Sequence, residues 1–543
     1  MKRETLKNAA VSTLVGATLV TGVIMLAPGW GKDAPPPAPG PVARAMAAAD
    51  TGAPASLADL DALIRNRERF VRDHPGDQQS WAALGSAYVE RGTRLGDTAY
   101  YPKAERALER SLGAVPAAEG NVDALVGMAE LANARRDFAS ARGYAEQARK
   151  RQPERWTVYP ALIDAYHGLG RYAAAGKAMD KLLELQSGPR VQGMEARVYW
   201  NKGWREDAAA LAYGATANSR TPAEKAVALH REGELAWERG EAADAVEHYT
   251  KALKAVPDSH RSLAGRARAL AALGRTDEAL DDYRSALAKV PLPEYALESG
   301  ELYESLGLTG DAATRYELMR EQVTRAGEHG VNGNLVLARY EADHGDPAAA
   351  VRRLQGEWRR GHRSVHVADT MGWALYKAGR AGDALPFARL ATDQGLRSAL
   401  FSYHLGEIER ALGDLGPARR HIDEALRTNP NFSPLLAPLA REARDALGEP
   451  AAGGPSDVTG DGPSPVEPPS PIEPPSPSPS ESAPVPAAPS AAASASPAAP
   501  SPSAPSGSGS TAAPAAPAAA PPAPALRPVQ RSATAASPAA TTG

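Results

Sequence analysis

Two histidines and an aspartate lie at a spacing that could hold a metal ion: His362, His366 and Asp369. Histidines four residues apart face the same side of a helix and can share one zinc ion. In this sequence, however, the two histidines straddle a predicted loop between helices. We therefore interpret them as solvated side chains and predict that the chain holds no metal.

The rest of the sequence lacks the motifs of an enzyme. It has no phosphate-binding loop, nucleotide fingerprint, nucleophile elbow or zinc-protease helix. The absence of cysteine excludes thiolate chemistry, disulfides and zinc–sulfur sites. Carboxylate pairs such as Asp281 and Asp282 are adjacent, so they would point apart on a helix. We predict a protein that is not an enzyme, has no cofactor and has no small-molecule substrate.

Charge gives little support for nucleic-acid binding. The net charge of the 543 residues is −3, so no global field attracts a polyanion. One basic cluster is interpreted as a solvated helix face; it contains Arg352, Arg353, Arg359, Arg360 and Arg363. We predict no nucleic-acid partner.

A small residue and an alanine twelve positions later recur along the chain roughly every 34 residues. Such a period indicates one supersecondary unit copied many times, which makes long binding surfaces more often than closed catalytic pockets. The pairs are Gly233 and Ala245, Ala267 and Ala279, Gly300 and Ala312, Ala338 and Ala350, Gly372 and Ala384, and Gly406 and Ala418.

One unit shows how the pattern folds. Leu229, Gly233 and Ala236 lie three or four residues apart, which is the spacing of one buried helical stripe. Gly240 ends this helix, and Pro257 ends the helix that follows because proline cannot continue the hydrogen-bond ladder. Each pair of helices leaves an apolar face that only the next pair can bury.

This pattern resembles the tetratricopeptide repeat family. Trp81, Leu84, Gly85 and Tyr88 match the first half of its motif, and a second set of residues matches the other half with tyrosine in place of phenylalanine: Ala279, Tyr283, Ala286 and Pro291. The resemblance implies an all-α fold, a right-handed α-solenoid of about ten helix-turn-helix repeats. The turn positions are Gly92, Arg136, Gly170, Gly203, Gly240, Gly274, Gly307, Gly345, Gly379 and Gly413.

Capping helices are predicted at both ends of the solenoid. Residues 56–75 contain Leu57–Asp73, which is typical of the second helix of an incomplete repeat, with Ser56 as its cap. The solenoid itself spans 76–448 and closes with a helix over Leu435–Leu447. Terminal repeats need polar outer faces, and this last helix has one.

In proteins of this family the first helix of each repeat lines the concave face. The resemblance therefore implies that residues six and three positions before each turn point into the groove. We predict that a partner peptide or helix contacts Trp200, Trp237, Trp373, Tyr376, Arg197, Arg268, Arg339, Glu234, Glu301 and Glu407. The alternative is that the aromatic residues pack against neighbouring helices.

The N-terminal segment, residues 1–28, predicts a membrane anchor or a signal peptide. Ala9–Ala27 carries no charge and is about long enough to cross a bilayer as a helix. Lys2, Arg3 and Lys7 precede it, which favours a single-pass protein with everything after Ala27 outside the cytoplasm. If the segment is cleaved, the protein is secreted. Residues 29–55 then form a Pro/Ala-rich linker.

The C-terminal tail, residues 449–543, is nearly all Ala, Pro, Ser, Gly and Thr. Such a segment cannot bury enough apolar area to offset its ordering entropy, so we predict disorder. Together these features favour a protein–protein interaction scaffold on the extracytoplasmic side of a membrane. The alternative is a structural self-assembling or spacer module of the cell envelope.

Overall fold

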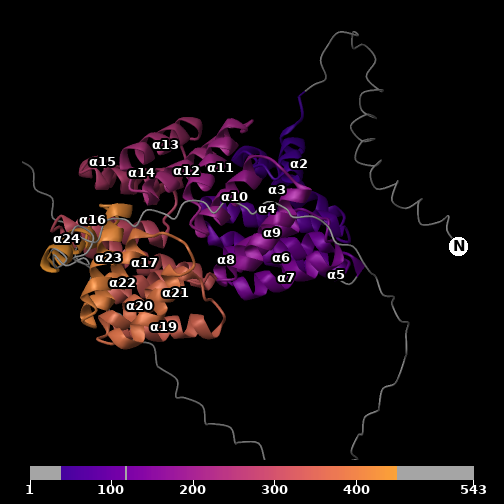
Figure 1. The fold of residues 1–543 in the computed structure, drawn as a ribbon. Coiled ribbons are helices and arrows are strands. Elements are labelled where there is room, and N and C mark those ends of the chain that lie inside the picture. Colours follow the sequence, from indigo (N-terminus) through magenta and orange to yellow (C-terminus); the bar gives the residue numbers. More distant parts are fainter. Residues whose placement is uncertain (1–37, 117–118, 449–543) are drawn as a thin grey trace, which may run out of the picture. The chain divides into compact units, whose positions relative to one another are not determined.

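The repeated stripes fold into helical hairpins, as the sequence predicts. The computed structural model describes residues 38–116 and 119–448. Within these ranges the chain forms 23 α-helices and no β-strand (Figure 1). The prediction of an all-α fold is confirmed, whereas the right hand of the superhelix stays a prediction.

All ten predicted hairpins are present, followed by a closing helix, α24 (Leu436–Ala446). Their first helices are α4 (Gln78–Leu95), α6 (Val122–Ala134), α8 (Val158–Gly168), α10 (Pro189–Asn201), α12 (Pro222–Glu238), α14 (His260–Ala272), α16 (Pro293–Ser305), α18 (Asn334–His344), α20 (Val365–Lys377) and α22 (Ala399–Ala411). Their second helices are α5 (Tyr101–Ala114), α7 (Phe138–Arg151), α9 (Tyr172–Leu185), α11 (Arg205–Ala217), α13 (Ala242–Ala255), α15 (Thr276–Lys289), α17 (Thr309–Glu328), α19 (Pro347–Arg359), α21 (Ala381–Thr392) and α23 (Leu415–Thr428).

The structure adds an eleventh hairpin at the N-terminal end. α3 (Leu57–Asp73) is capped by the Ser56 hydroxyl, as predicted, but it pairs with a further helix, α2 (Pro41–Thr51). The interpretation of residues 29–55 as a linker is therefore wrong for 41–51. Pro41 starts this helix, and Ala45 is buried against the first core cluster of the chain, so the proline-rich composition hid a short amphipathic helix.

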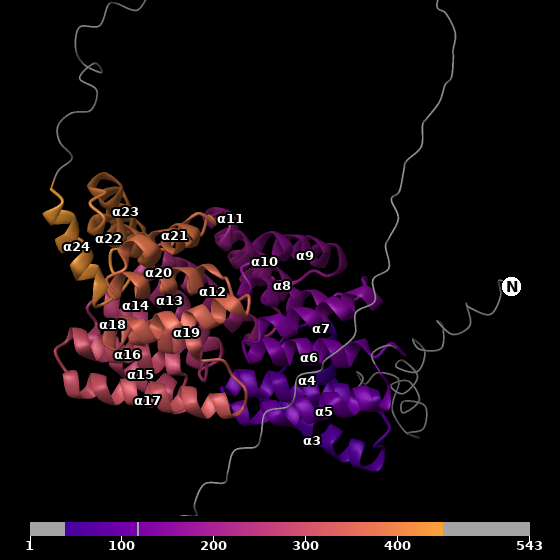
Figure 2. The same ribbon diagram turned by 90° about the horizontal axis from the view of Figure 1, so that it is seen from below.

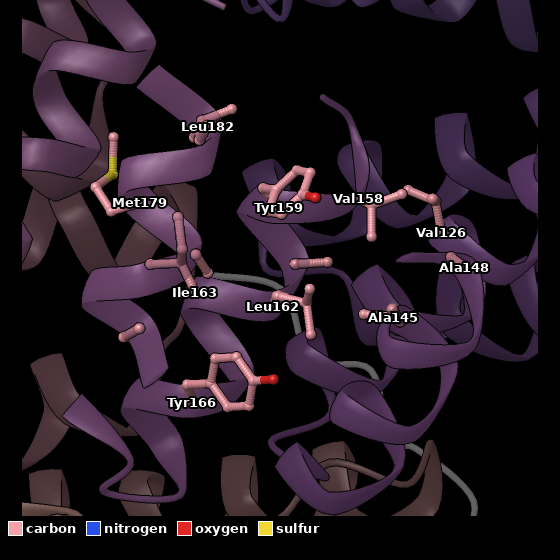
Figure 3. Packing of buried hydrophobic residues seen from close by; sticks show 14 of the residues in the cluster. Val126, Ala145, Ala148, Val158, Tyr159, Leu162, Ile163, Tyr166, Met179 and Leu182 are labelled. Atoms are coloured by element: carbon pink, nitrogen blue, oxygen red, sulfur yellow. The ribbon is translucent and has the colours of Figure 1, made fainter. Parts of the chain in front are cut away.

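Small residues let the two helices of a hairpin approach closely. A Cβ on Gly233 would lie 2.6 Å from the ring of Tyr249 in the facing helix. In the third repeat Ile163 takes the glycine's place and is fully buried in one cluster with Met179 of α9 (Figure 3). Methionine is flexible enough to adapt to a larger neighbour, so the hairpin keeps its fold.

The chain curves toward its first helices. Most consecutive first helices contact each other, whereas consecutive second helices make no comparable contact within the described ranges. The first helices therefore line the inner side of the curve, and the second helices face outward. We call the inner side the concave face.

The curve is tight enough that later repeats contact earlier ones. The Tyr172 hydroxyl accepts a hydrogen bond of 2.9 Å from the backbone N–H of Val365, 193 residues later. Asn429 donates one of 2.8 Å to the carbonyl of Trp237, 192 residues earlier, and Arg135 donates one of 3.0 Å to the carbonyl of His329, 194 residues later. Figures 1 and 2 show these early and late helices side by side.

We call this contact the seam. It joins the turns inside repeats one to five to the loops between repeats in the second half of the chain. Two glycine turns are essential to it: a Cβ on Gly170 would lie 2.1 Å from the carbonyl oxygen of Arg363, and one on Gly203 would lie 2.3 Å from that of Gly395. Glycine allows the backbones to meet there without steric clash.

Two predictions fall outside the described residues: the membrane or signal helix over Ala9–Ala27 and the disordered tail over 449–543. Among the residues that the structure does describe, none of the helices has the length and apolar character needed to cross a membrane.

Candidate protein-binding face

The three tryptophans predicted to anchor a partner are buried. Trp200, Trp237 and Trp373 keep only 8%, 6% and 4% of their surface exposed. The prediction that they protrude into the groove is wrong, and the alternative of packing against neighbouring helices is confirmed. The reason is the contact between consecutive first helices, which covers the positions that the family pattern places in the groove.

Trp373 is fixed from several sides. Its indole N–H donates a hydrogen bond of 2.8 Å to Asp343 on α18. Its ring stacks on His404 of α22, with the ring centroids 4.0 Å apart, and His404 bonds Asp369 over 2.9 Å. The side chain thus joins three consecutive first helices, which is a structural role.

Tyr376 is half-buried one helical turn beyond Trp373. Its hydroxyl donates a long hydrogen bond of 3.5 Å to Glu407, and Arg410 contacts the same carboxylate over 2.7 Å. Glu407 is buried, so it needs these partners. Two predicted site residues, Tyr376 and Glu407, therefore lie together and contact each other.

The predicted arginines and glutamates pair with one another along the concave face. Arg268 of α14 lies 3.9 Å from Glu234 of α12 and 3.4 Å from Glu298 of α16. The Tyr249 hydroxyl also donates to Glu234 over 2.5 Å. Arg197 of α10 is paired in the same way with Asp164 of α8.

The pairing continues toward the C-terminal repeats. His344 of α18 lies 3.9 Å from Glu301 and 3.2 Å from Glu304, both of α16. Lys377 of α20 reaches Asp343 of α18 over 3.6 Å. We call these contacts between consecutive first helices the polar ladder. The alternation of Arg and Glu in the sequence is largely this ladder, so most of these charges are already satisfied within the chain.

Three arginines of the concave face have no ion pair or side-chain hydrogen bond in the described part of the chain: Arg231, Arg261 and Arg339. Only Arg339 was predicted as a site residue. Arg231 lies three residues before Glu234, and Arg261 lies seven before Arg268, so each shares the inner stripe of its helix. The six-and-three pattern does not include them: Arg231 lies one helical turn before its position six, and Arg261 lies two helical turns before its own.

Charges of both signs surround Arg231. Burial lowers the pKa of its guanidinium, the positive charge of Arg197 lowers it further, and the negative charge of Glu234 raises it. Burial also lowers the pKa of His230 to about 4, so this neighbour is uncharged at neutral pH. Because Arg231 has no ion pair among the described residues, a negative group from outside would be stabilised beside it.

The histidine pair considered for metal binding does not form a site. His362 is buried rather than solvated, and its Nδ1 bonds Glu357 over 2.5 Å. His366 lies on α20 with its ring centroid 5.5 Å from that of Phe401. No group of three possible metal ligands occurs among the described residues.

A chain of helical hairpins with small residues at each close approach defines a class, the helical-repeat scaffolds. The family model described as tetratricopeptide repeat matches residues 126–189, 230–292, 264–326 and 370–432. The chain carries tetratricopeptide repeats in these regions, as its sequence pattern indicates. Repeats of this kind suggest a protein-interaction scaffold.

No curated protein matches the chain. Among solved structures, a tetratricopeptide repeat protein from Parabacteroides merdae is 18% identical, with a TM-score of 0.31, over 48% of this chain and 98% of its own. Human IFIT1, solved as a dimer with PPP-AAAA, is 15% identical, with a TM-score of 0.42, over 71% of this chain and 86% of its own. Pseudomonas aeruginosa pilF is 17% identical, with a TM-score of 0.30, over 41% and 97%. Likeness at these identities concerns the fold alone.

Proposed function

We propose that the protein is a scaffold that holds an acidic segment of a partner protein along its concave face. The observation that carries this proposal is the set of unpaired arginines, Arg231, Arg261 and Arg339, on a face where most of the other predicted site charges are paired in the polar ladder. An acidic peptide would supply the missing carboxylates and form charge-assisted hydrogen bonds.

A labelled peptide tests this binding mode. A fluorescein-labelled peptide of alternating Glu and Gly, twelve residues long, should bind in an anisotropy titration, and its Lys counterpart should not. Arg231→Glu should weaken binding at least about tenfold. Arg110→Glu is the matched control, since Arg110 is exposed on the outward-facing helix α5. Equal binding by both variants would refute the concave site. Binding of an oligonucleotide in preference to the peptide would overturn the predicted absence of a nucleic-acid partner.

The extracytoplasmic location is part of the same proposal. It rests on the charge-free run Ala9–Ala27 behind Lys2, Arg3 and Lys7. Protease added to intact spheroplasts should degrade the repeats while a cytoplasmic marker survives. Comparing the mass of the mature chain with the full sequence separates an anchor from a cleaved signal peptide.

One observation favours the alternative of self-assembly. In the second half of the chain the described residues form no layer over the turns: none of their atoms lies within 4 Å of a Cβ on Gly307 or Gly413. Leu306 and Leu412 beside them are 43% and 40% exposed, whereas Leu169, in the covered turn of the third repeat, is 6% exposed. A second copy could continue the seam head to tail, which would build a filament.

Light scattering distinguishes this alternative. Self-assembly predicts a mass that rises with concentration and that falls to one chain in the double variant Leu306→Lys, Leu412→Lys. A monomeric wild-type chain at all concentrations would exclude it.

A further inference from the structure

A cavity of about 580 Å³ lies at the seam, where the turn between α8 and α9 meets the loop between α19 and α20 and the end of α21. This volume is within the range of small-molecule sites. The residues that line this cavity include none of the polar ladder and none of the unpaired arginines of the concave face.

Two aromatic side chains form walls of this cavity, and both are held in place. The Tyr172 hydroxyl accepts a hydrogen bond of 2.9 Å from the backbone N–H of Val365, across the seam. Trp358 packs edge-on against Phe387 with the ring centroids 5.2 Å apart. Leu390 adds an aliphatic surface. Fixed aromatic walls are typical of sites that accept a planar ring, because little side-chain entropy is lost on binding.

The charge of the cavity is positive. Arg171 and Arg363 line it, and none of its lining residues is acidic. Neither arginine has an ion pair or a side-chain hydrogen bond in the described ranges; the guanidinium of Arg363 lies 5.3 Å from the centre of the Trp358 ring.

The basic cluster singled out in the sequence divides in the structure. Arg352 pairs with Asp346, Arg353 with Glu341, and Arg360 with Glu357; these three are satisfied within the chain. Arg363 is the member of the cluster that lines the cavity, and Trp358 lies within the same stretch of sequence. Of the two arginines that have no ion pair among the described residues, Arg359 and Arg363, only Arg363 lines the cavity.

We propose that this cavity binds a small aromatic anion, whose ring lies against Trp358 and whose negative group contacts Arg171 and Arg363. The two arginines come from opposite sides of the seam, one from the third repeat and one from the loop before the ninth. A ligand that bridges them adds a contact between early and late repeats, so its binding also stabilises the seam.

The probe for this site is 2-naphthoate, titrated by calorimetry into the full chain, with neutral 2-naphthamide as the matched ligand. We expect one naphthoate per chain, a higher unfolding temperature on binding, and binding of the amide at least about tenfold weaker. Arg363→Gln and Arg171→Gln should each weaken naphthoate binding by a similar factor. Arg359→Gln is the control, since Arg359 belongs to the same cluster but does not line the cavity.

Failure of naphthoate to bind, equal binding of the amide, or unchanged binding in both Arg363→Gln and Arg171→Gln would each overturn the proposal. Helical circular dichroism of every variant shows whether it is folded. If one variant unfolds, the other still decides the result, because the two arginines lie on different elements of the seam.

Discussion

Gly203 lies directly against Gly395: a Cβ on Gly203 would be 2.3 Å from the carbonyl oxygen of Gly395 and 3.7 Å from its Cα. The two residues belong to repeats from different halves of the chain. Their contact shows that the superhelix closes on itself. Repeats in an open solenoid touch only their sequence neighbours, so the seam is an additional source of stability.

Gly203→Ala should be strongly destabilising, because the methyl group would collide with the Gly395 backbone. Gly203 also has a positive φ of 81°, which costs any other residue about 1 kcal/mol. We expect a total loss of roughly 3 kcal/mol, measured as a lower unfolding midpoint.

Gly379→Ala is the matched control for the seam. Its φ is 75°, but no atom of residues 38–116 or 119–448 lies within 4 Å of the added Cβ. Gly379→Ala should lower the free energy of unfolding only by the cost of a positive φ at alanine, about 1 kcal/mol. Equal losses in the two variants would show that the seam contributes nothing to stability.

Trp373→Ala tests the corrected role of the tryptophans. The ring is buried, stacked on His404 and bonded to Asp343, so its removal should cost roughly 3–5 kcal/mol of unfolding free energy. Trp204→Ala should cost much less, since Trp204 is 48% exposed. If Trp373→Ala keeps the wild-type unfolding midpoint, the helix–helix packing described for this residue is wrong.

The seam should also weaken in acid because His260 takes part in it. His260 bonds the Tyr295 hydroxyl over 2.9 Å and the carbonyl of Arg94, in the first repeat, over 3.2 Å. Burial, and then the charge of Arg261, lower its pKa to about 4 from 6.5. The folded state therefore binds fewer protons than the unfolded state between these values. The contribution of His260 to the free energy of unfolding is complete above pH 6.5. It falls as the pH drops from 6.5 to 4, by up to about 1.4 kcal/mol per pH unit.

His260→Gln should make this part of the stability profile less steep, measured by urea unfolding between pH 7 and pH 4. It should not remove the slope, because burial also lowers the pKa of His167 and His230. His74→Gln, at an exposed position, should leave the profile unchanged. A wild-type slope in His260→Gln would contradict the assignment, because the titration would then belong to other groups.

The repeats could be predicted from the sequence because each depends on local spacing. The glycines and prolines that end the helices, such as Gly240 and Pro257, act within their own hairpin, and all ten hairpins were located correctly. The short helix over Pro41–Thr51 was missed because its proline and alanine content is also typical of a linker.

The site was harder to predict because it depends on contacts between repeats. Trp237 occupies a groove position in the family pattern, yet it is buried and its carbonyl accepts a hydrogen bond from Asn429 across the seam. Glu234 and Arg268 belong to the alternation of Glu and Arg that the sequence predicts to bind a partner, yet they pair with each other. No local spacing reveals which arginine will lack a partner, so Arg231 and Arg261 emerged only from the structure.

Site-specific photo-cross-linking in the native host tests the central claim most directly. A photoreactive amino acid at position 231 should form a cross-link to an acidic segment of one protein partner, identified by mass spectrometry, whereas the same amino acid at position 110 should not. Cross-links from position 110 alone, or from position 231 to nucleic acid, would contradict the claim that the concave face holds an acidic peptide.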